Sequence, residues 1–184
     1  MTDVEKLYDI LMTDNISSSI NENLGSLLML IPELRDTIGF EHKHPHHHLD
    51  VWDHTICALM YSTLDFDVRL ALLLHDIGKP HSYQDDGDIR HFKGHPKVSK
   101  KMTKEILKRL GFSDLYNKKI CYLIANHDAP ITTRDINKYP ELSEKRLEIQ
   151  RCDALAHHPD KLEKRMEYIT LISNKILTKK NSTI

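Results

Sequence analysis

Apolar residues along this chain recur at the three- and four-residue spacing of amphipathic α-helices. In the first such stretch, residues 3–13, one stripe carries Val4, Leu7, Ile10 and Leu11. Capping side chains, prolines and glycines delimit further stretches of the same kind. The helices predicted in this way cover residues 3–13, 20–30, 32–39, 51–63, 68–77, 96–110, 113–126 and 143–158, with a last one that ends near residue 179. Their expected N-terminal caps include Asp3, Asp50, Asp67, Ser113 and Ser143.

The stretch 68–77 differs from the others because it is apolar on nearly every side. Residues Leu70–Leu74 form an unbroken apolar run, and Gly78 is the expected stop. A helix without a polar face belongs in the centre of a core. We therefore expect this helix to be the one around which the others pack.

Residues 82–92 are the stretch with strand-like character. The turn sequence Asp85-Asp86-Gly87-Asp88 separates short β-prone pieces, which predicts a small hairpin. The fold class predicted is therefore all-α: a single-domain orthogonal helical bundle with one short hairpin near 82–92. We expect residues 1–184 to form one domain whose core is about 32–158, with N-terminal helices and a C-terminal helix packed on it.

Composition narrows the class of protein. The chain has 184 residues, of which 40% are hydrophobic and 29% charged, values that suit a globular domain. Its net charge of -1 has no asymmetry typical of dedicated nucleic-acid or membrane-surface proteins. Three scattered cysteines without a CxxC pair suit a reducing compartment. There is no signal-peptide pattern, and no apolar run approaches the roughly 20 residues that span a bilayer. We expect a soluble, cytoplasmic protein with no membrane partner.

One predicted helix, 96–110, carries a basic face with Lys100, Lys101, Lys104, Lys108 and Arg109. Glu105 and neighbouring acidic residues dilute this face. We interpret it as a solvated surface, with contact to an RNA backbone as the minor alternative. RNA is thus a partner that the charge does not indicate.

Histidine is unusually frequent, and its placement indicates metal chemistry. The sequence contains 13 histidines, all between His42 and His158. The pair His75-Asp76 directly follows the apolar run Leu70–Leu74. A titratable pair at the end of a core helix is costly unless something compensates its burial, and a metal ion would do so. Taken singly, such a histidine is more often a hydrogen-bonded core residue.

The combination of these residues resembles a known family. His54 precedes the pair His75-Asp76 by twenty-one residues, and a distant Asp153 follows. The order and the sequence Leu-Leu-His-Asp-Ile-Gly-Lys-Pro resemble the HD superfamily of metal-dependent phosphohydrolases, which is all-α. The segments around residues 47–55 and 91–95 are similar to the HD region of bacterial CCA-adding tRNA nucleotidyltransferases. No Gly-Ser motif with a following Asp-x-Asp pair is present, so we expect an HD module that does not add nucleotides.

The resemblance implies a ligand set for one or two divalent transition metal ions. It assigns His54, His75, Asp76 and Asp153 to a first ion. His95 and His127 match the additional histidines of members with two ions, where Asp76 bridges. Mixed imidazole and carboxylate ligands favour Mn, Fe, Co, Ni or Zn over Mg.

Other polar residues have open interpretations. Lys79 either neutralises a substrate phosphoryl oxygen or is an ordinary solvated lysine at a helix end. His95, expected at an N-cap next to Pro96, suits a phosphate contact as well as a metal. His91, His47 and His48 are expected to line the cleft or to support the ligands. The histidines interpreted as exposed are His42, His44, His46, His157 and His158.

The function predicted is hydrolysis of a phosphomonoester or phosphodiester in a nucleotide or a nucleic-acid end. A metal ion lowers the pKa of bound water from 15.7 to about 7, and Asp76 and Lys79 are the predicted catalytic residues. Lys79, His91, His95 and His48 are the predicted substrate contacts. Activities of the 2′,3′-cyclic nucleotide phosphodiesterase or nucleotidase type follow from the resemblance. The alternative is a metal-containing module that binds a nucleotide or tRNA without turnover.

Overall fold

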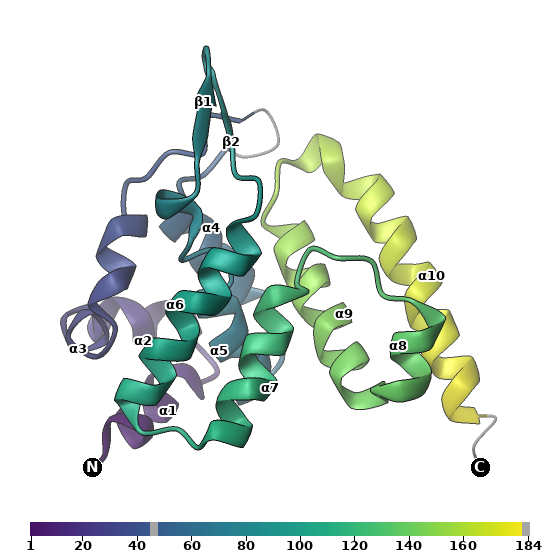
Figure 1. Ribbon diagram of the computed structural model, residues 1–184, viewed down its shortest axis with the longest axis horizontal. Helices are drawn as coiled ribbons and strands as arrows, with labels where there is room; N and C mark the ends of the chain where they lie inside the picture. Colours follow the sequence, from purple (N-terminus) through teal and green to yellow (C-terminus); the bar gives the residue numbers. More distant parts are fainter. Residues whose placement is uncertain (45–47, 182–184) are drawn as a thin grey trace.

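The computed structural model describes residues 1–44 and 48–181 and consists mainly of helices (Figure 1). The α-helices are α1 (Asp3–Leu11), α2 (Ile16–Glu22), α3 (Leu24–Leu30), α4 (Val51–Met60), α5 (Phe66–Leu74), α6 (His95–Leu110), α7 (Asp114–Ala125), α8 (Thr133–Lys138), α9 (Pro140–Leu155) and α10 (Leu162–Asn181). Short 3-10 turns are η1 (Pro32–Thr37), η2 (Lys79–His81) and η3 (Pro159–Lys161). The predicted all-α class is confirmed. The predicted hairpin also forms, from antiparallel β1 (Gln84–Asp86) and β2 (Ile89–His91).

Helix α5 lies at the centre, as its apolar sequence predicts. Every residue from Asp67 to Leu74 is buried, and the helix packs against α1, α4, α7 and α9. The main apolar core forms around it and extends from Leu7 in α1 to Ala156 beyond α9. The residues that directly follow α5 are therefore surrounded by α4, α7 and α9.

The C-terminal part has a smaller core of its own. Ile131 and Ile136 pack with Ile172 and Ile176, which fixes α10 against α8 and α9. Figure 1 shows α8, α9 and α10 grouped on one side, with α6, α7 and the hairpin opposite them. Within the described residues, no helix combines the length and apolarity needed to cross a membrane.

Several predicted helix ends are wrong, and each has a local cause. Helix α1 is capped by Thr2, whose side chain forms a reciprocal capping box with Glu5, so Asp3 is inside the helix. Helix α5 is capped by Asp65, since the Asp65 carboxylate accepts a hydrogen bond from the N–H of Val68. Asp65 and Asp67 are both aspartates before an apolar run, and sequence alone did not separate them.

The remaining differences affect the middle and the end of the chain. The stretch 20–30 is divided at Asn23 into α2 and α3. Helix α8 was not predicted, because its six residues are too few for a periodic pattern. Helix α9 begins at Pro140, three residues before Ser143, and ends at Leu155. The caps predicted at Asp50 and Ser113 are confirmed.

Candidate metal centre

Asp76 is the middle of a cluster of histidines. It lies in the turn that directly follows α5 and is 1% exposed. Its Oδ2 atom lies 3.1 Å from Nε2 of His75 and 3.8 Å from Nε2 of His54. Its Oδ1 atom lies 3.2 Å from Nε2 of His95 and 3.9 Å from Nε2 of His127. The two carboxylate oxygens thus face two different pairs of imidazoles.

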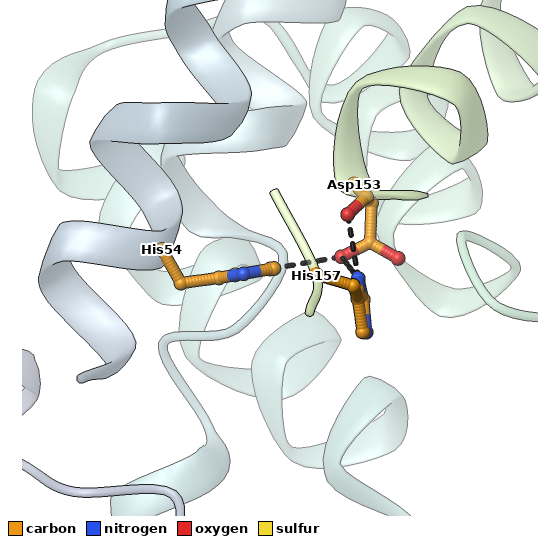
Figure 2. A group of neighbouring side chains, drawn as sticks. All are labelled: His54, Asp153 and His157. Carbon is orange, nitrogen blue, oxygen red and sulfur yellow. Dashed lines mark hydrogen bonds and ion pairs between the residues drawn. The ribbon is translucent and has the colours of Figure 1, made fainter. Parts of the chain in front are cut away.

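Asp153 joins the first pair from the opposite side. Its Oδ1 atom lies 2.9 Å from Nε2 of His54 and 3.6 Å from Nε2 of His75. Figure 2 shows the side chain of His54 on α4 reaching across to Asp153 on α9. Residues 99 positions apart in sequence therefore meet because α4 and α9 both pack against α5. The structure brings together all six residues for which a metal contact was predicted.

The four histidines around Asp76 share one arrangement of their rings. In each, Nδ1 faces a backbone carbonyl oxygen and Nε2 faces the carboxylates. The carbonyl partners are Ala156 for His54 at 3.2 Å, Leu72 for His75 at 2.7 Å, Phe92 for His95 at 3.0 Å and Ile124 for His127 at 2.7 Å. A ring that donates from Nδ1 has its lone pair on Nε2, the form that ligates a metal.

Buried polar atoms at the centre lack well-aligned hydrogen bonds. Nε2 of His75 and both carboxylate oxygens of Asp76 are in this state, although Oδ2 of Asp76 is ion-paired with Lys79 at 2.6 Å. Such atoms are rare in folded proteins because leaving them unsatisfied is costly. Among the described residues, three groups of side chains each have their own ligand atoms within 4.8 Å of one another. The groups are His54, His75 and Asp76; Asp76, His95 and His127; and His54, Asp153 and His157. These clusters are able to hold a divalent metal ion.

The two imidazole pairs differ in whether they border a cavity, although His127 of the second pair is itself only 3% exposed. His54 and His75, the deep pair, are 0% exposed. His95 and His127, the open pair, line a cavity of about 660 Å³ together with Asp76 and Asp153. The cavity therefore borders the open pair and not the deep pair.

Charge is distributed unevenly across the cluster. Burial lowers the pKa of His75, but the carboxylates of Asp76 and Asp153 outweigh it and raise this pKa to about 10. Burial raises the pKa of Asp76, but the positive charges of His75 and Lys79 hold it well below its usual range. For His127, burial and the charge on His75 lower the pKa to about 4. Without a metal, the raised pKa keeps His75 protonated beside the carboxylates of Asp76 and Asp153, and a metal ion would displace this proton.

Lys79 and His42 form a buried pair beside Asp76. Nζ of Lys79 lies 2.6 Å from Oδ2 of Asp76 and 2.9 Å from Nε2 of His42. The side chains are 5% and 2% exposed, respectively. The solvated alternative for Lys79 is therefore wrong, as is the exposed position predicted for His42. No local pattern indicated His42, because its contact with Lys79 is tertiary.

His157 is a site residue that the sequence analysis missed. It was interpreted as exposed but is 7% exposed, and its Nδ1 atom donates to the backbone oxygen of Asp153 at 2.6 Å. Figure 2 shows the two side chains together on the same segment. The signal was available: Asp153 and His157 are four residues apart in a stretch predicted as helix, and such residues share a face.

The other predicted histidines are placed as follows. His91, at the end of β2, lines the cavity. His95 is the first residue of α6 rather than its N-cap, which is Gly94 with φ of 83°. His48 is exposed, and its ring lies 5.8 Å from that of His158, so its substrate contact stays a prediction. His46 and His47 lie outside the described residues.

Gly78 sets the distance between the two halves of the cluster. A Cβ atom at this position would lie 2.5 Å from the backbone nitrogen of Ser99 and 3.0 Å from the carbonyl oxygen of His95. The backbone N–H of Gly78 also donates to Oγ of Ser99 at 3.0 Å. Its φ of -85° is ordinary, so glycine is needed here for close approach of α6 and not for a left-handed turn. This contact brings His95 to Asp76.

The comparison with known proteins agrees with the geometry. The family model described as "HD domain" matches residues 46–170, so the chain belongs to the HD domain family. This superfamily is of the metal-dependent phosphohydrolase type. An A-adding tRNA nucleotidyltransferase from Deinococcus radiodurans is 36% identical over 121 residues, which cover 62% of this chain and 28% of that protein. A CC-adding tRNA nucleotidyltransferase from Thermus thermophilus is 28% identical over 132 residues, 67% of this chain and 30% of that protein. The chain spans less than a third of the length of these relatives.

Proposed function

We propose that this chain is a metal-dependent phosphohydrolase that cleaves a phosphomonoester or phosphodiester of a nucleotide or of a nucleic-acid end. The observation that carries the proposal is Asp76, whose two buried oxygens face two pairs of imidazoles beside a cavity of about 660 Å³. A purely structural histidine cluster would have no use for an adjoining cavity.

Each proposed ligand has a defined place. His54, His75, Asp76 and Asp153 would hold a first ion, and Asp76 would share a second with His95 and His127. This nitrogen and oxygen set suits Mn, Fe, Co, Ni or Zn. When bound, the metal supplies an activated water and Lewis-acid polarisation of the phosphoryl group.

The chain's own side chains account for the rest of the chemistry. Asp76 would orient the attacking water and accept its proton, since its carboxylate lies at the centre of the cluster and lines the cavity. Lys79 would balance the charge that develops on the phosphoryl oxygens. His42 accepts a hydrogen bond from Nζ of Lys79 through Nε2, which fixes the ammonium group beside the site. His91 and His95 would contact the phosphate from the cavity wall.

The walls of the cavity favour a nucleotide-like substrate. Arg90, Lys93, Lys164 and Arg165 supply positive charge, whereas Ala129, Pro130, Tyr168 and Ile169 supply an apolar side. The positive side chains would contact a phosphate group, and the apolar side would contact a base or one face of a sugar. The names of the two relatives, which are tRNA nucleotidyltransferases, support the same substrate class. The first compounds to test are 2′,3′-cyclic nucleotides and nucleoside monophosphates.

The test is a substrate panel assayed across a series of metals. Metal-free protein is reconstituted with each of the five metals and offered cyclic nucleotides, nucleoside monophosphates and an aryl phosphate. We expect hydrolysis that depends on the metal and is abolished by a chelator. Binding of nucleotides without cleavage of any compound would replace this proposal with a non-catalytic, metal-containing binding module.

A further inference from the structure

Helix α6 begins at the metal centre and carries a row of lysines away from it. His95, its first residue, faces Asp76, and Lys93 just before it lines the cavity. Beyond these, one face of the helix carries Lys97, Lys100, Lys101, Lys104 and Lys108, all of them exposed. We call these five residues the lysine face of α6.

The five residues of the lysine face present positive charge with no acidic side chain between them. At 3.6 residues per turn, Lys97, Lys101, Lys104 and Lys108 fall within an arc of about 60°, and Glu105 lies on its flank. None of the five forms an ion pair with any residue in the described parts of the chain. The opposite face, which includes Ser99, Thr103, Ile106 and Leu107, is buried against the core. Acidic residues do lie beside this face, since Glu105 is on its flank and Glu33 pairs with Arg109 at 2.8 Å, but within the described residues neither forms an ion pair with the five lysines.

Charge is also segregated along the chain. Residues 93–119 contain nine lysines and arginines but two acidic residues, for a local net charge of +7. The whole chain has a net charge of -1. A surface of this kind repels cations, and it adds little to the binding free energy of a neutral partner. A polyanion gains binding free energy at each lysine, because each contact releases counterions.

We propose that the lysine face of α6 binds the phosphate backbone of a nucleic-acid strand, which places the end of that strand in the cavity beside Asp76. Lys97 and Lys108 are separated by about 16 Å along the helix axis, enough to contact several consecutive phosphates. Lys93 continues the row into the cavity wall. The placement of the strand end rests on the proposed function, whereas the binding of the backbone does not.

Binding is tested with a short labelled RNA strand and a DNA strand of the same sequence, by fluorescence anisotropy. A variant with Lys97, Lys101, Lys104 and Lys108 replaced by glutamine is compared with the intact chain; glutamine is itself a good helix former. The matched control replaces Lys6, Lys138, Lys175 and Lys180, exposed lysines outside α6, and changes the net charge equally.

We expect the intact chain to bind with a strong dependence on salt between about 50 and 200 mM. The α6 variant should bind at least about tenfold more weakly, and its slope of log affinity against log salt should be shallower by about 3, at roughly 0.7 per lost contact for single strands. The control should bind like the intact chain. Comparison of the RNA and DNA arms identifies which backbone is preferred.

Three results would overturn the inference: no binding of either strand at the lowest salt, equal weakening in both variants, or binding of anionic vesicles without binding of nucleic acid.

Turnover measurements separate this inference from the proposed function. With a strand that carries a terminal phosphate, the α6 variant should show a higher KM and an unchanged kcat, while hydrolysis of a small phosphoester is unaffected. Lysine-dependent binding without any hydrolysis would refute the proposed function and leave the backbone contact standing.

Discussion

The deep pair and the open pair of histidines use the same chemistry in different surroundings. His54 and His75 are fully buried between α4, α5 and α9, and Asp153 lies against them. His95 and His127 come from the ends of α6 and α7 and line the cavity. Asp76 belongs to both pairs through its two oxygens. We propose a division of labour on this basis, in which the deep pair would retain an ion and the open pair would present one to substrate.

The largest expected effect follows from removing the residue that the two pairs share. Asp76→Ala should lose most of its metal, and its metal affinity should fall by at least about 100-fold. Even substitution of residues that only support the ligands lowers metal affinity by about 10- to 100-fold. Elemental analysis after dialysis measures this loss. Asp128→Ala, which alters an exposed carboxylate of the same cavity, is the control. Full occupancy in Asp76→Ala would remove the basis for the shared site.

The two pairs can then be separated by single substitutions. His54→Ala should lower the metal content and the activity together, whereas His127→Ala should lower the activity by a larger factor than the metal content. The reason is that the open pair alone lines the cavity. Metal content and kcat are measured on the same samples. Identical losses in both variants would contradict the division.

Gly78→Ala should weaken the open pair without changing any ligand. The added methyl group meets the backbone of Ser99 at 2.5 Å, so the start of α6 must move and His95 moves with it. We expect a stability loss of about 1–3 kcal/mol, as for other overpacked sites, and reduced activity with the deep pair still loaded. Gly25→Ala in α3, where nothing lies within 4 Å, is the control and should be neutral or stabilising. Equal behaviour of the two variants would show that close approach at Gly78 is unimportant.

Substitution of Lys79 tests whether the positive charge beside Asp76 stabilises the transition state of the reaction or only the folded structure. Lys79→Gln should reduce kcat by about 100-fold, the typical loss for one group that stabilises transition-state charge, and should spare metal binding. Loss of metal in parallel with kcat would assign Lys79 a structural role in place of the catalytic one.

The smallest expected effect is on the acid stability of the metal-free protein. Burial and the nearby Lys79 lower the pKa of His42 to about 3, and burial lowers the pKa of His157 to about 4. As the pH falls, these histidines bind protons in the unfolded chain near pH 6.5, well before they do so in the folded chain. The folding stability that each neutral ring contributes is therefore present above pH 6.5 and is lost as the pH falls toward 4. His42→Gln should therefore reduce proton uptake on unfolding near pH 5 by about one proton. Replacement of the half-exposed His81 by Gln is the control. Denaturation at several pH values measures the slope, and an unchanged slope in His42→Gln would contradict the buried, neutral state of that ring.

Sequence predicted the parts of this molecule that depend on local pattern and on the order and spacing of ligand-type residues. The apolar run Leu70–Leu74 marks the central helix because nothing but a core accommodates it. The spacing of His54, His75 and Asp76 matches the HD pattern, and the structure brings these residues together. His42 could not be found, because its role arises from a contact with Lys79 that depends on tertiary packing. His157 could have been found from its spacing to Asp153 but was assigned to a helix end that was placed too far along the chain.

Titration of metal into the metal-free protein, with turnover of a 2′,3′-cyclic nucleotide recorded at each step, tests the central claim most directly. The account predicts no turnover without metal, a rise as the ions bind and saturation once the Asp76 cluster is filled. Asp76→Ala should stay at the baseline throughout. Turnover that is independent of metal, or a fully loaded protein that cleaves neither cyclic nucleotides, monophosphates nor aryl phosphates, would contradict it.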